Sequence, residues 1–140
     1  MIVKPKCKIR FHDPDVGYEN LLAEPTGEGL FVIKSIPYFI YNISIDDVVR
    51  AYEDETDEVL CFSETVRHSA HKTIRVRVTD YTVEDDRGEA LLDKLESFGC
   101  TIETLPPRLI AVDLPDEDTE KPVVKFLTNN SIRWEWADPS

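Results

Sequence analysis

Long hydrophobic runs are missing from this 140-residue sequence. The richest apolar stretch, LFVIKSIPYFIYNISI at 30–45, is interrupted by Lys34 and Pro37, whereas a helix that spans a bilayer needs about 20 predominantly apolar residues. The N-terminal MIVKPKCKIRFHD has lysines but no continuous apolar region and no small-residue cleavage site, and a secretory signal requires both. We therefore expect a soluble protein of the cytoplasm that does not enter a membrane.

Motifs for metal binding and thiol redox chemistry are also missing. The three cysteines, Cys7, Cys61 and Cys100, are far apart, and no CxxC pair or Cys/His cluster at ligand spacing exists. This excludes zinc-finger and thioredoxin-type sites. Each cysteine lies in an apolar, strand-like context, so we expect reduced thiols in the core. We expect no metal and no cofactor.

Positive charge is scarce. The chain has 16 Lys and Arg against 28 Asp and Glu, which gives a net charge of −12. The excess is even, because residues 1–70 hold 7 basic and 13 acidic side chains and residues 71–140 hold 9 and 15. Such a field repels phosphate backbones and argues against nucleic acid as a partner. It either keeps the protein in solution or suits a basic partner.

Residues 1–70 read as strands and turns. In VKPKCKIRF at 3–11, apolar or compact residues alternate with Lys and Arg, which predicts a half-buried strand with a basic face and places Pro5 at a sheet edge. The turns EPTGEG and DETD each separate two strand-like segments and predict two hairpins. We expect a β-rich subdomain at 1–70, either a small antiparallel β-barrel or a strongly twisted sheet.

Residues 71–140 alternate between strands and helices. A strand at 72–80 is followed by a helix in DDRGEALLDKLESFG, with Asp85 or Asp86 as N-cap and Gly99 after its end. Strands at 100–105 and 108–114, a shorter helix near 119–129 and a final strand in SIRWEWA complete the order β-α-β-β-α-β. This order predicts a ferredoxin-like subdomain at 71–140 and an α+β fold overall.

The strands of this second sheet have two different faces. Ile74, Val76, Val78, Trp134 and Trp136 should face the helices, and Arg75, Arg77, Arg133 and Glu135 should lie on the open face. In the ferredoxin-like strand order Glu135 can pair with Arg75 or Arg77. An RNA-binding sheet of the RRM type would carry aromatic residues on that face, so RNA binding there is disfavoured.

Two segments carry a resemblance to a known family. IPYFIYNISIDDVVRA at 36–51 and FSETVRHSAHKTIRV at 62–76 resemble the bacterial domain-of-unknown-function 4265 family, through Pro37, Tyr38, Phe39, Ser44, Asp47, Val49, Ala51, Ser69, His71, Thr73, Arg75 and Val76. The chain departs from the family pattern at Asp46, Ala70 and Lys72. The resemblance implies a two-part fold and no established activity. Some relatives occur beside bacterial toxin systems, which implies an immunity-like role.

The sequence RHSAHK at 67–72 brings His68, Ser69 and His71 close together. Because residues three apart in an extended segment point to opposite faces, the histidines share a metal only if the chain turns sharply. A nucleophilic Ser69 with His71 as base lacks a nucleophile elbow or Gly-rich loop for an oxyanion hole. We expect Ser69, His71 and Arg75 at a structural junction, where His71 and Ser69 satisfy buried backbone groups. A hydrolase-type site at His71 is the less favoured alternative.

Acidic residues crowd two places. Asp116, Glu117, Asp118 and Glu120 precede the second predicted helix and suit its positive end. Glu53, Asp54, Glu55, Asp57 and Glu58 crowd one hairpin tip, where their repulsion has no such compensation.

Three functions follow from these observations. We favour a non-catalytic protein that binds a basic protein partner through the acidic hairpin, in the manner of an immunity or antitoxin-like factor. The alternatives are a small-ligand sensor that uses the second half or the cleft between the halves, and an enzyme at His71. We assign no catalytic residue.

Overall fold

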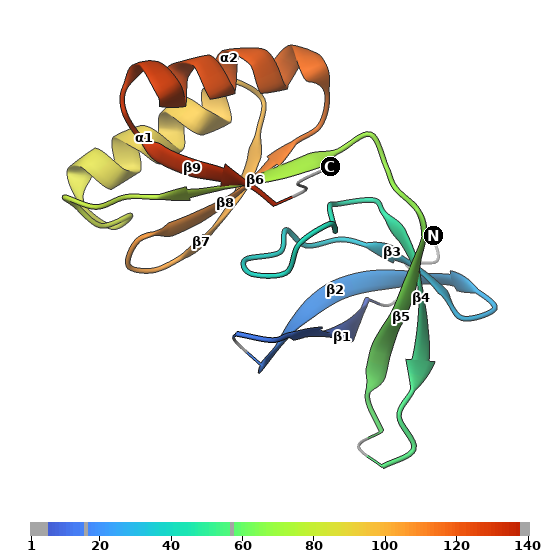
Figure 1. Cartoon of the computed structure of the whole chain (residues 1–140). Helices are drawn as coiled ribbons and strands as arrows, with labels where there is room; N and C mark the ends of the chain where they lie inside the picture. Colours follow the sequence, from blue (N-terminus) through green and yellow to red (C-terminus); the bar gives the residue numbers. More distant parts are fainter. Residues whose placement is uncertain (1–5, 16, 57, 138–140) are drawn as a thin grey trace.

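The computed structural model describes residues 6–15, 17–56 and 58–137. It is an α+β fold in which a closed barrel of five strands precedes a second sheet of four strands that carries two helices (Figure 1). The predictions of an α+β class and of an N-terminal barrel are confirmed. Pro5, predicted at a sheet edge, lies outside the described residues.

The barrel closes with one parallel pairing. Its strands are β1 (Cys7–Asp13), β2 (Gly17–Gly27), β3 (Leu30–Ile33), β4 (Val48–Glu53) and β5 (Leu60–Arg67). Consecutive strands are antiparallel, and β1 pairs with β5 in parallel. Five strands that alternate in direction leave the first and the last pointing the same way, so closure requires a parallel seam. The predicted antiparallel barrel therefore contains one parallel pair, between β1 and β5.

Apolar side chains, which alternate with polar ones along the strands, fill the interior of the barrel. In β1, Ile9 and Phe11 are buried, whereas Lys8 and His12 are exposed. The barrel core consists of Ile9, Phe11, Leu21, Ala23, Phe31, Ile33, Ile40, Ile43, Val49 and Ala51. Two of these residues, Ile40 and Ile43, come from the connection between β3 and β4, which therefore forms part of the core.

The second sheet has the strand order β7-β8-β6-β9, and all neighbouring strands are antiparallel. Its elements are β6 (Lys72–Arg77), α1 (Asp86–Ser97), β7 (Thr101–Leu105), β8 (Leu109–Leu114), α2 (Glu117–Asn129) and β9 (Arg133–Trp136). Both helices lie on the face turned away from the barrel (Figure 1). The chain therefore follows the predicted β-α-β-β-α-β order. Within the described ranges, neither helix is long and apolar enough to cross a membrane.

The second core lies between this sheet and its helices. It contains Ile74, Val76 and Val78 from the first strand region, and Trp134 and Trp136 pack against it. Arg75, Arg77, Arg133 and Glu135 belong to the other face, where they line a shared cavity. The predicted division of the two faces is confirmed.

Both helices begin after an aspartate. Asp85 precedes α1, and Gly99, with a φ of +99°, follows its end. The helix α2 starts earlier than predicted, and the side chain of Asp116 accepts a hydrogen bond of 2.8 Å from the backbone N of Thr119. The acidic block expected before α2 therefore supplies its N-cap and first turn. Hydrogen bonds from the backbone and the side chain of Thr119 lower the pKa of Asp116.

Gly88 in α1 allows the helix to pack closely on the preceding turn. A Cβ at this position would lie 2.1 Å from the carbonyl oxygen of Thr82 and 2.6 Å from the Cα of Val83. These are backbone atoms, so the turn would have to move. We expect Gly88→Ala to lower the free energy of unfolding by about 1–3 kcal/mol, although alanine favours a helix interior over glycine by about 1 kcal/mol.

Urea denaturation measures this effect, and the exposed neighbour Glu89 offers a control. Glu89→Ala should stay within about 0.5 kcal/mol of the wild type. A Gly88→Ala variant as stable as the wild type would show that the close approach of helix and turn is unimportant.

Candidate functional site

The connection at 34–47, between β3 and β4, fastens the barrel to the second sheet. The hydroxyl groups of Ser44 and Thr73 lie 2.7 Å apart, and both residues are buried. The backbone N of Asn42 donates to the carbonyl oxygen of Ala137 over 2.7 Å. The hydroxyl of Tyr38 donates to the carbonyl of Thr104 in β7 over 3.0 Å. The connection is thus anchored along the whole width of the second sheet.

Asp47 is the polar centre of this junction. Its side chain is buried and accepts hydrogen bonds from the backbone N of Ser44 (3.0 Å) and of Ser69 (2.7 Å). Nδ1 of His68 lies 3.2 Å from the same carboxylate. These donors come from the segments that precede β4 and β6, so one carboxylate holds the two segments together.

Ser69 is occupied within the junction. Its hydroxyl donates to the carbonyl oxygen of Ile45 over 2.6 Å and accepts from the backbone N of His71 over 3.1 Å. The structure thus places Ser69 among backbone groups, as expected for a structural residue. A nucleophile would instead need its proton directed to a base.

His71 lies between two carboxylates. Its Nδ1 is 2.9 and 3.0 Å from the two carboxylate oxygens of Asp113 in β8, and its Nε2 is 3.5 Å from a carboxylate oxygen of Asp46. We expected His71 to satisfy backbone groups, and its partners are carboxylates instead. Burial raises the pKa of Asp113, and the hydrogen bond and charge of His71 oppose that rise.

This arrangement gives His71 the role of a clamp. Both ring nitrogens face acids that lie 25 and 42 residues away in the sequence, so the imidazole links the turn at Asp46 to Asp113 in β8. The histidines 68 and 71 contact different aspartates. The described part of the chain holds no group of three or more His, Cys, Asp or Glu side chains placed to bind a metal.

Arg75 in β6 carries a buried charge, with 4% of its surface exposed. Its guanidinium donates to the carbonyl oxygens of Phe39 (3.0 Å) and Ile40. Its central carbon lies 4.8 Å from the ring centre of Tyr41, and Nη1 lies 4.0 Å from a carboxylate oxygen of Glu135. The predicted pairing of Glu135 with Arg75 is confirmed. Burial lowers the pKa of Arg75, and these neighbours together with Glu19 raise it.

Glu19 in β2 holds the same segment from the barrel side. Its carboxylate accepts hydrogen bonds from the backbone N of Tyr38 (2.6 Å), Phe39 (3.0 Å) and Ile40 (3.2 Å). The chain at 38–40 is therefore clamped between an acid that binds its N–H groups and an arginine that binds its carbonyls. Sequence reasoning missed Glu19, because backbone amides as partners leave no residue pattern.

Most of the chain matches one protein family. Residues 19–136 match the profile of a family described as domain of unknown function (DUF4265). The chain belongs to this family. Within the DUF4265 protein, the two segments that carry the resemblance, 36–51 and 62–76, contact one another through Ser44 and Thr73, Asp47 and Ser69, and Arg75 and Phe39. The residues of this chain that carry the resemblance thus meet at the junction between the two sheets.

The DUF4265 protein also resembles a solved structure, a hypothetical protein from Neisseria gonorrhoeae. The two share 19% sequence identity and a TM-score of 0.67 over 99% of this chain and 96% of the other. At that identity the likeness shows the fold alone. It covers both the barrel and the second sheet. No curated protein matches the chain.

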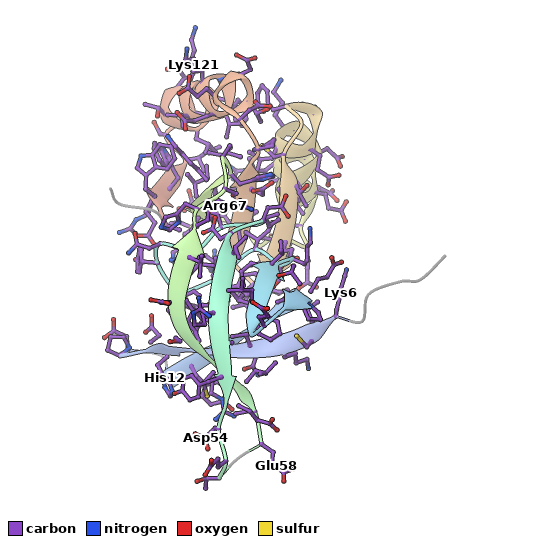
Figure 2. All side chains as sticks on the ribbon, turned by 90° about the vertical axis from the view of Figure 1, so that its right-hand side faces the viewer. Lys6, His12, Asp54, Glu58, Arg67 and Lys121 are labelled. Atoms are coloured by element: carbon purple, nitrogen blue, oxygen red, sulfur yellow. The ribbon has the colours of Figure 1, made fainter. Side chains whose placement is uncertain are left out.

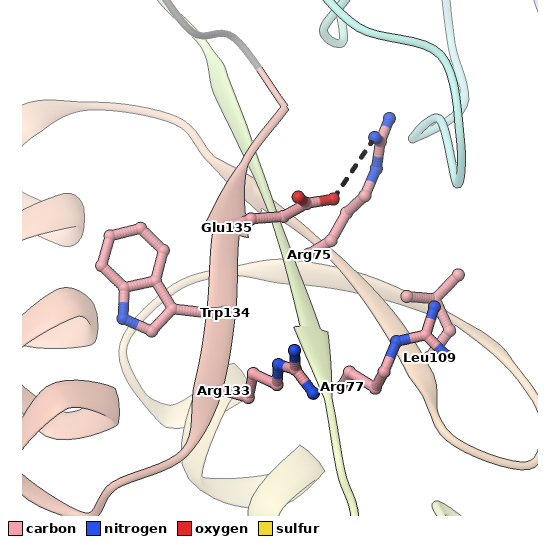
Figure 3. Close-up of a pocket in the computed structure, with 6 residues that line it drawn as sticks. All are labelled: Arg75, Arg77, Leu109, Arg133, Trp134 and Glu135. Atoms are coloured by element: carbon pink, nitrogen blue, oxygen red, sulfur yellow. Dashed lines mark ion pairs between the residues drawn. The ribbon is translucent and has the colours of Figure 1, made fainter.

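The open face of the second sheet is hollowed beside the junction of the DUF4265 protein. A cavity of about 290 Å³ is lined by Arg75, Arg77, Leu109, Arg133, Trp134 and Glu135 (Figure 3). In Figure 3 the side chain of Arg75 points toward the barrel, and Arg77 and Arg133 lie next to one another on β6 and β9. None of the residues that line this cavity belongs to the His71 clamp.

The acidic hairpin between β4 and β5 forms the other candidate site. Figure 2 shows Asp54 and Glu58 at the end of the molecule opposite Lys121 of α2. The carboxylate of Asp54 accepts from the backbone N of Thr56 over 2.8 Å and so stabilises the turn. Glu53, Glu55 and Glu58 are exposed. Asp57 lies outside the described residues.

Proposed function

We propose that this DUF4265 protein is a non-catalytic binding protein that presents its β4–β5 hairpin to a basic protein partner. The observation that supports this is the position of Glu53, Glu55 and Glu58. They are exposed, and none forms an ion pair with another described residue. Like charges crowded on one tip repel each other, and an approaching basic surface relieves that repulsion. The attraction between the two surfaces also raises the rate at which they associate.

The roles of the hairpin acids differ. Asp54 binds the turn's own backbone, so its charge is partly used within the hairpin. The three glutamates have side chains left for a partner. We therefore assign contact with the partner to the glutamates and the shape of the tip to Asp54.

The geometry at His71 favours binding over catalysis. A hydrolase would need Ser69 aimed at His71, whereas the Ser69 hydroxyl donates to Ile45. The resemblance implies an immunity-like role, because some relatives occur beside toxin systems. In that role the basic partner is a toxin that the protein neutralises. Three free thiols, at Cys7, Cys61 and Cys100, suit a reducing compartment such as the cytoplasm.

We also infer that the second half, 71–140, is a ferredoxin-like subdomain that packs on the 1–70 barrel. The strand order β7-β8-β6-β9, with antiparallel neighbours and both helices on one face, supports this assignment. In this arrangement the helices cover one face only. The other face is left for the junction and for the arginine-lined cavity.

A charge-neutral hairpin tests the proposed function. The variant Glu53→Gln/Glu55→Gln/Glu58→Gln should bind the partner about tenfold more weakly than the wild type, because each exposed charge pair contributes about 0.2–1 kcal/mol. The dependence of Kd on salt should flatten as well. The partner is first captured from native cell lysate at low salt and released at moderate salt, and is then purified and titrated.

The control carries the same change of charge on the helix side. Glu84→Gln/Asp93→Asn/Glu96→Gln alters three exposed acids in or next to α1 and should bind like the wild type. Equal affinity of the hairpin variant and the wild type would reject the hairpin as the site. Failure to retain a basic protein at either salt concentration would reject the function.

A further inference from the structure

Two arginines lie opposite one another on neighbouring strands of a protein of net charge −12, and neither has an acidic partner among the described residues. Arg77 in β6 and Arg133 in β9 are directly opposite in the strand register. Both side chains are exposed, and neither forms an ion pair with another described residue. Like charges directly opposite on a sheet destabilise it. The neighbouring pair in the same register, Arg75 and Glu135, is complementary by contrast.

The two arginines line hollows that suit a small molecule. The cavity of about 290 Å³ contains both, together with Leu109 (Figure 3). A second cavity of about 200 Å³ shares Arg77 and Leu109 with the first and continues along Leu105 and Pro106. Ligand pockets combine a few polar groups with an apolar lining. Here the polar groups are the guanidiniums of Arg77 and Arg133, and Leu109 is the apolar residue next to them.

Charge within the cleft sets the orientation of a ligand. At one end Arg75 is already bound to backbone carbonyls and lies next to Glu135. A third hollow on that side is lined by Asp13, Asp15 and Glu135, and Arg77 and Leu109 border it as well. Carboxylates therefore lie at the Arg75 end, and an anionic group is repelled from it. The attractive end is at Arg133 and the neighbouring Arg77, which line the first cavity together.

We propose that this cleft binds a small organic anion, a carboxylate or phosphate group attached to an apolar body. The anionic group is held between the guanidiniums of Arg77 and Arg133, which match the geometry of carboxylate and phosphate oxygens. The apolar body lies on Leu109 and extends toward Leu105 and Pro106. Binding removes the repulsion between the two arginines, so the unpaired charges become a source of affinity.

The size of the ligand follows from the field of the protein. A nucleic acid or another polyanion is repelled by the excess of acidic residues, whereas one anionic group meets mainly the two nearest arginines. The cavity volumes also suit a molecule of metabolite size rather than a protein surface. The site shares no residue with the acidic hairpin, so the two binding functions are independent.

The first part of the test compares three probes of similar shape. Phenyl phosphate, 3-phenylpropionate and the neutral 3-phenylpropionamide are titrated into the ¹⁵N-labelled full chain at constant ionic strength in sodium chloride. The two anions should shift the amide signals of Arg77, Leu109 and Arg133, and the amide should not. The tighter of the two anions identifies the preferred anionic group.

The second part uses variants. Arg77→Gln and Arg133→Gln should each weaken binding of the anionic probe about tenfold, because a hydrogen bond to a charged group is among the stronger ones. Arg67→Gln removes an exposed arginine of β5 outside the cavities and should leave the affinity unchanged. Amide spectra that are unchanged away from the cleft verify that each variant folds.

Three results would overturn the proposal. The first is that no anionic probe shifts the signals of the cleft. The second is that 3-phenylpropionamide binds there as tightly as 3-phenylpropionate, which would mean that the site recognises only the apolar body. The third is that Arg67→Gln weakens binding as much as Arg77→Gln does, which would mean that anions respond to total charge alone.

Discussion

Replacing Arg75 with methionine is expected to lower the free energy of unfolding by about 2–4 kcal/mol, because two carbonyl oxygens beside the buried side chain lose a charged hydrogen-bond donor. Methionine has a similar length and fills much of the same volume, but it has no donors. The carbonyl oxygens of Phe39 and Ile40 would lose the guanidinium that now binds them, and Glu19 would remain beside the segment without the opposing positive charge. The connection that joins the two sheets would be held from one side only.

Arg77 provides the matched control for this prediction. It lies two residues further along the same face of β6, and it is exposed whereas Arg75 is buried. Arg77→Met should change the unfolding free energy by no more than about 0.5 kcal/mol. Urea denaturation of both variants measures the contrast. Losses of similar size in both would mean that the buried hydrogen bonds of Arg75 contribute little to stability.

Arg75 also shows where sequence reasoning succeeds and where it stops. The alternation of β6 places Arg75 on the face opposite Ile74 and Val76, and the structure confirms that face. Alternation assigns a side of the sheet but does not tell what covers it. The segment at 38–40 covers Arg75, and the two meet only through the tertiary fold. Its burial therefore has no local signal.

The same distinction holds for the elements and the contacts between them. The spacing of Leu91 and Leu95 predicts α1, and both residues are buried against the sheet. The partners at the junction are side chains distant in sequence, such as His71 and Asp113, or a side chain and backbone, such as Glu19 and Tyr38. Periodicity records how one element faces the core. It records nothing about which turn of one sheet meets which strand of another.

The candidate sites follow this division. The acidic tip was predictable, because a hairpin turn and the charges within it are neighbours in the sequence. The pairing of Arg77 with Arg133 required the strand register, which depends on how β6 and β9 meet across 56 residues. Long-range register thus converts a charged sheet face into a specific pair of like charges, and the proposed anion site depends on that pair.

The second large effect concerns the buried carboxylate of Asp113. Its residue is 3% exposed, and His71 is its hydrogen-bond partner. His71→Ala should lower the unfolding free energy at neutral pH by about 2–4 kcal/mol, because it leaves a charged acceptor buried without its donor. Asp113→Asn should cost less, since the side chain of His71 is 23% exposed and can turn toward water.

The double variant His71→Ala/Asp113→Asn isolates the charge. A buried amide without a partner costs less than a buried carboxylate. The double variant should therefore be more stable than His71→Ala at neutral pH, although it carries one more substitution. Such non-additivity is the signature of two groups that act as a pair.

The pH dependence of these two variants gives the decisive contrast. Burial raises the pKa of Asp113, nearby Asp46 raises it further, and His71 lowers it; without His71 only the raising influences remain. A carboxyl group with a raised pKa in the folded state binds its proton more tightly there than in the unfolded chain, so it destabilises the fold as the pH increases through that range. The difference in unfolding free energy by which His71→Ala is less stable than the double variant should thus be largest at neutral pH.

This deficit should shrink as the pH is lowered and Asp113 takes up its proton, at pH values above the ordinary range of an aspartate. The thiol of Cys100, which also faces Asp113, does not titrate in this range, because burial and Asp113 raise its pKa to about 11. Urea denaturation at a series of pH values measures the difference between the two variants. A difference that is the same at acid and neutral pH would show that His71 stabilises the junction by packing, and that its bond to Asp113 does not compensate a buried charge.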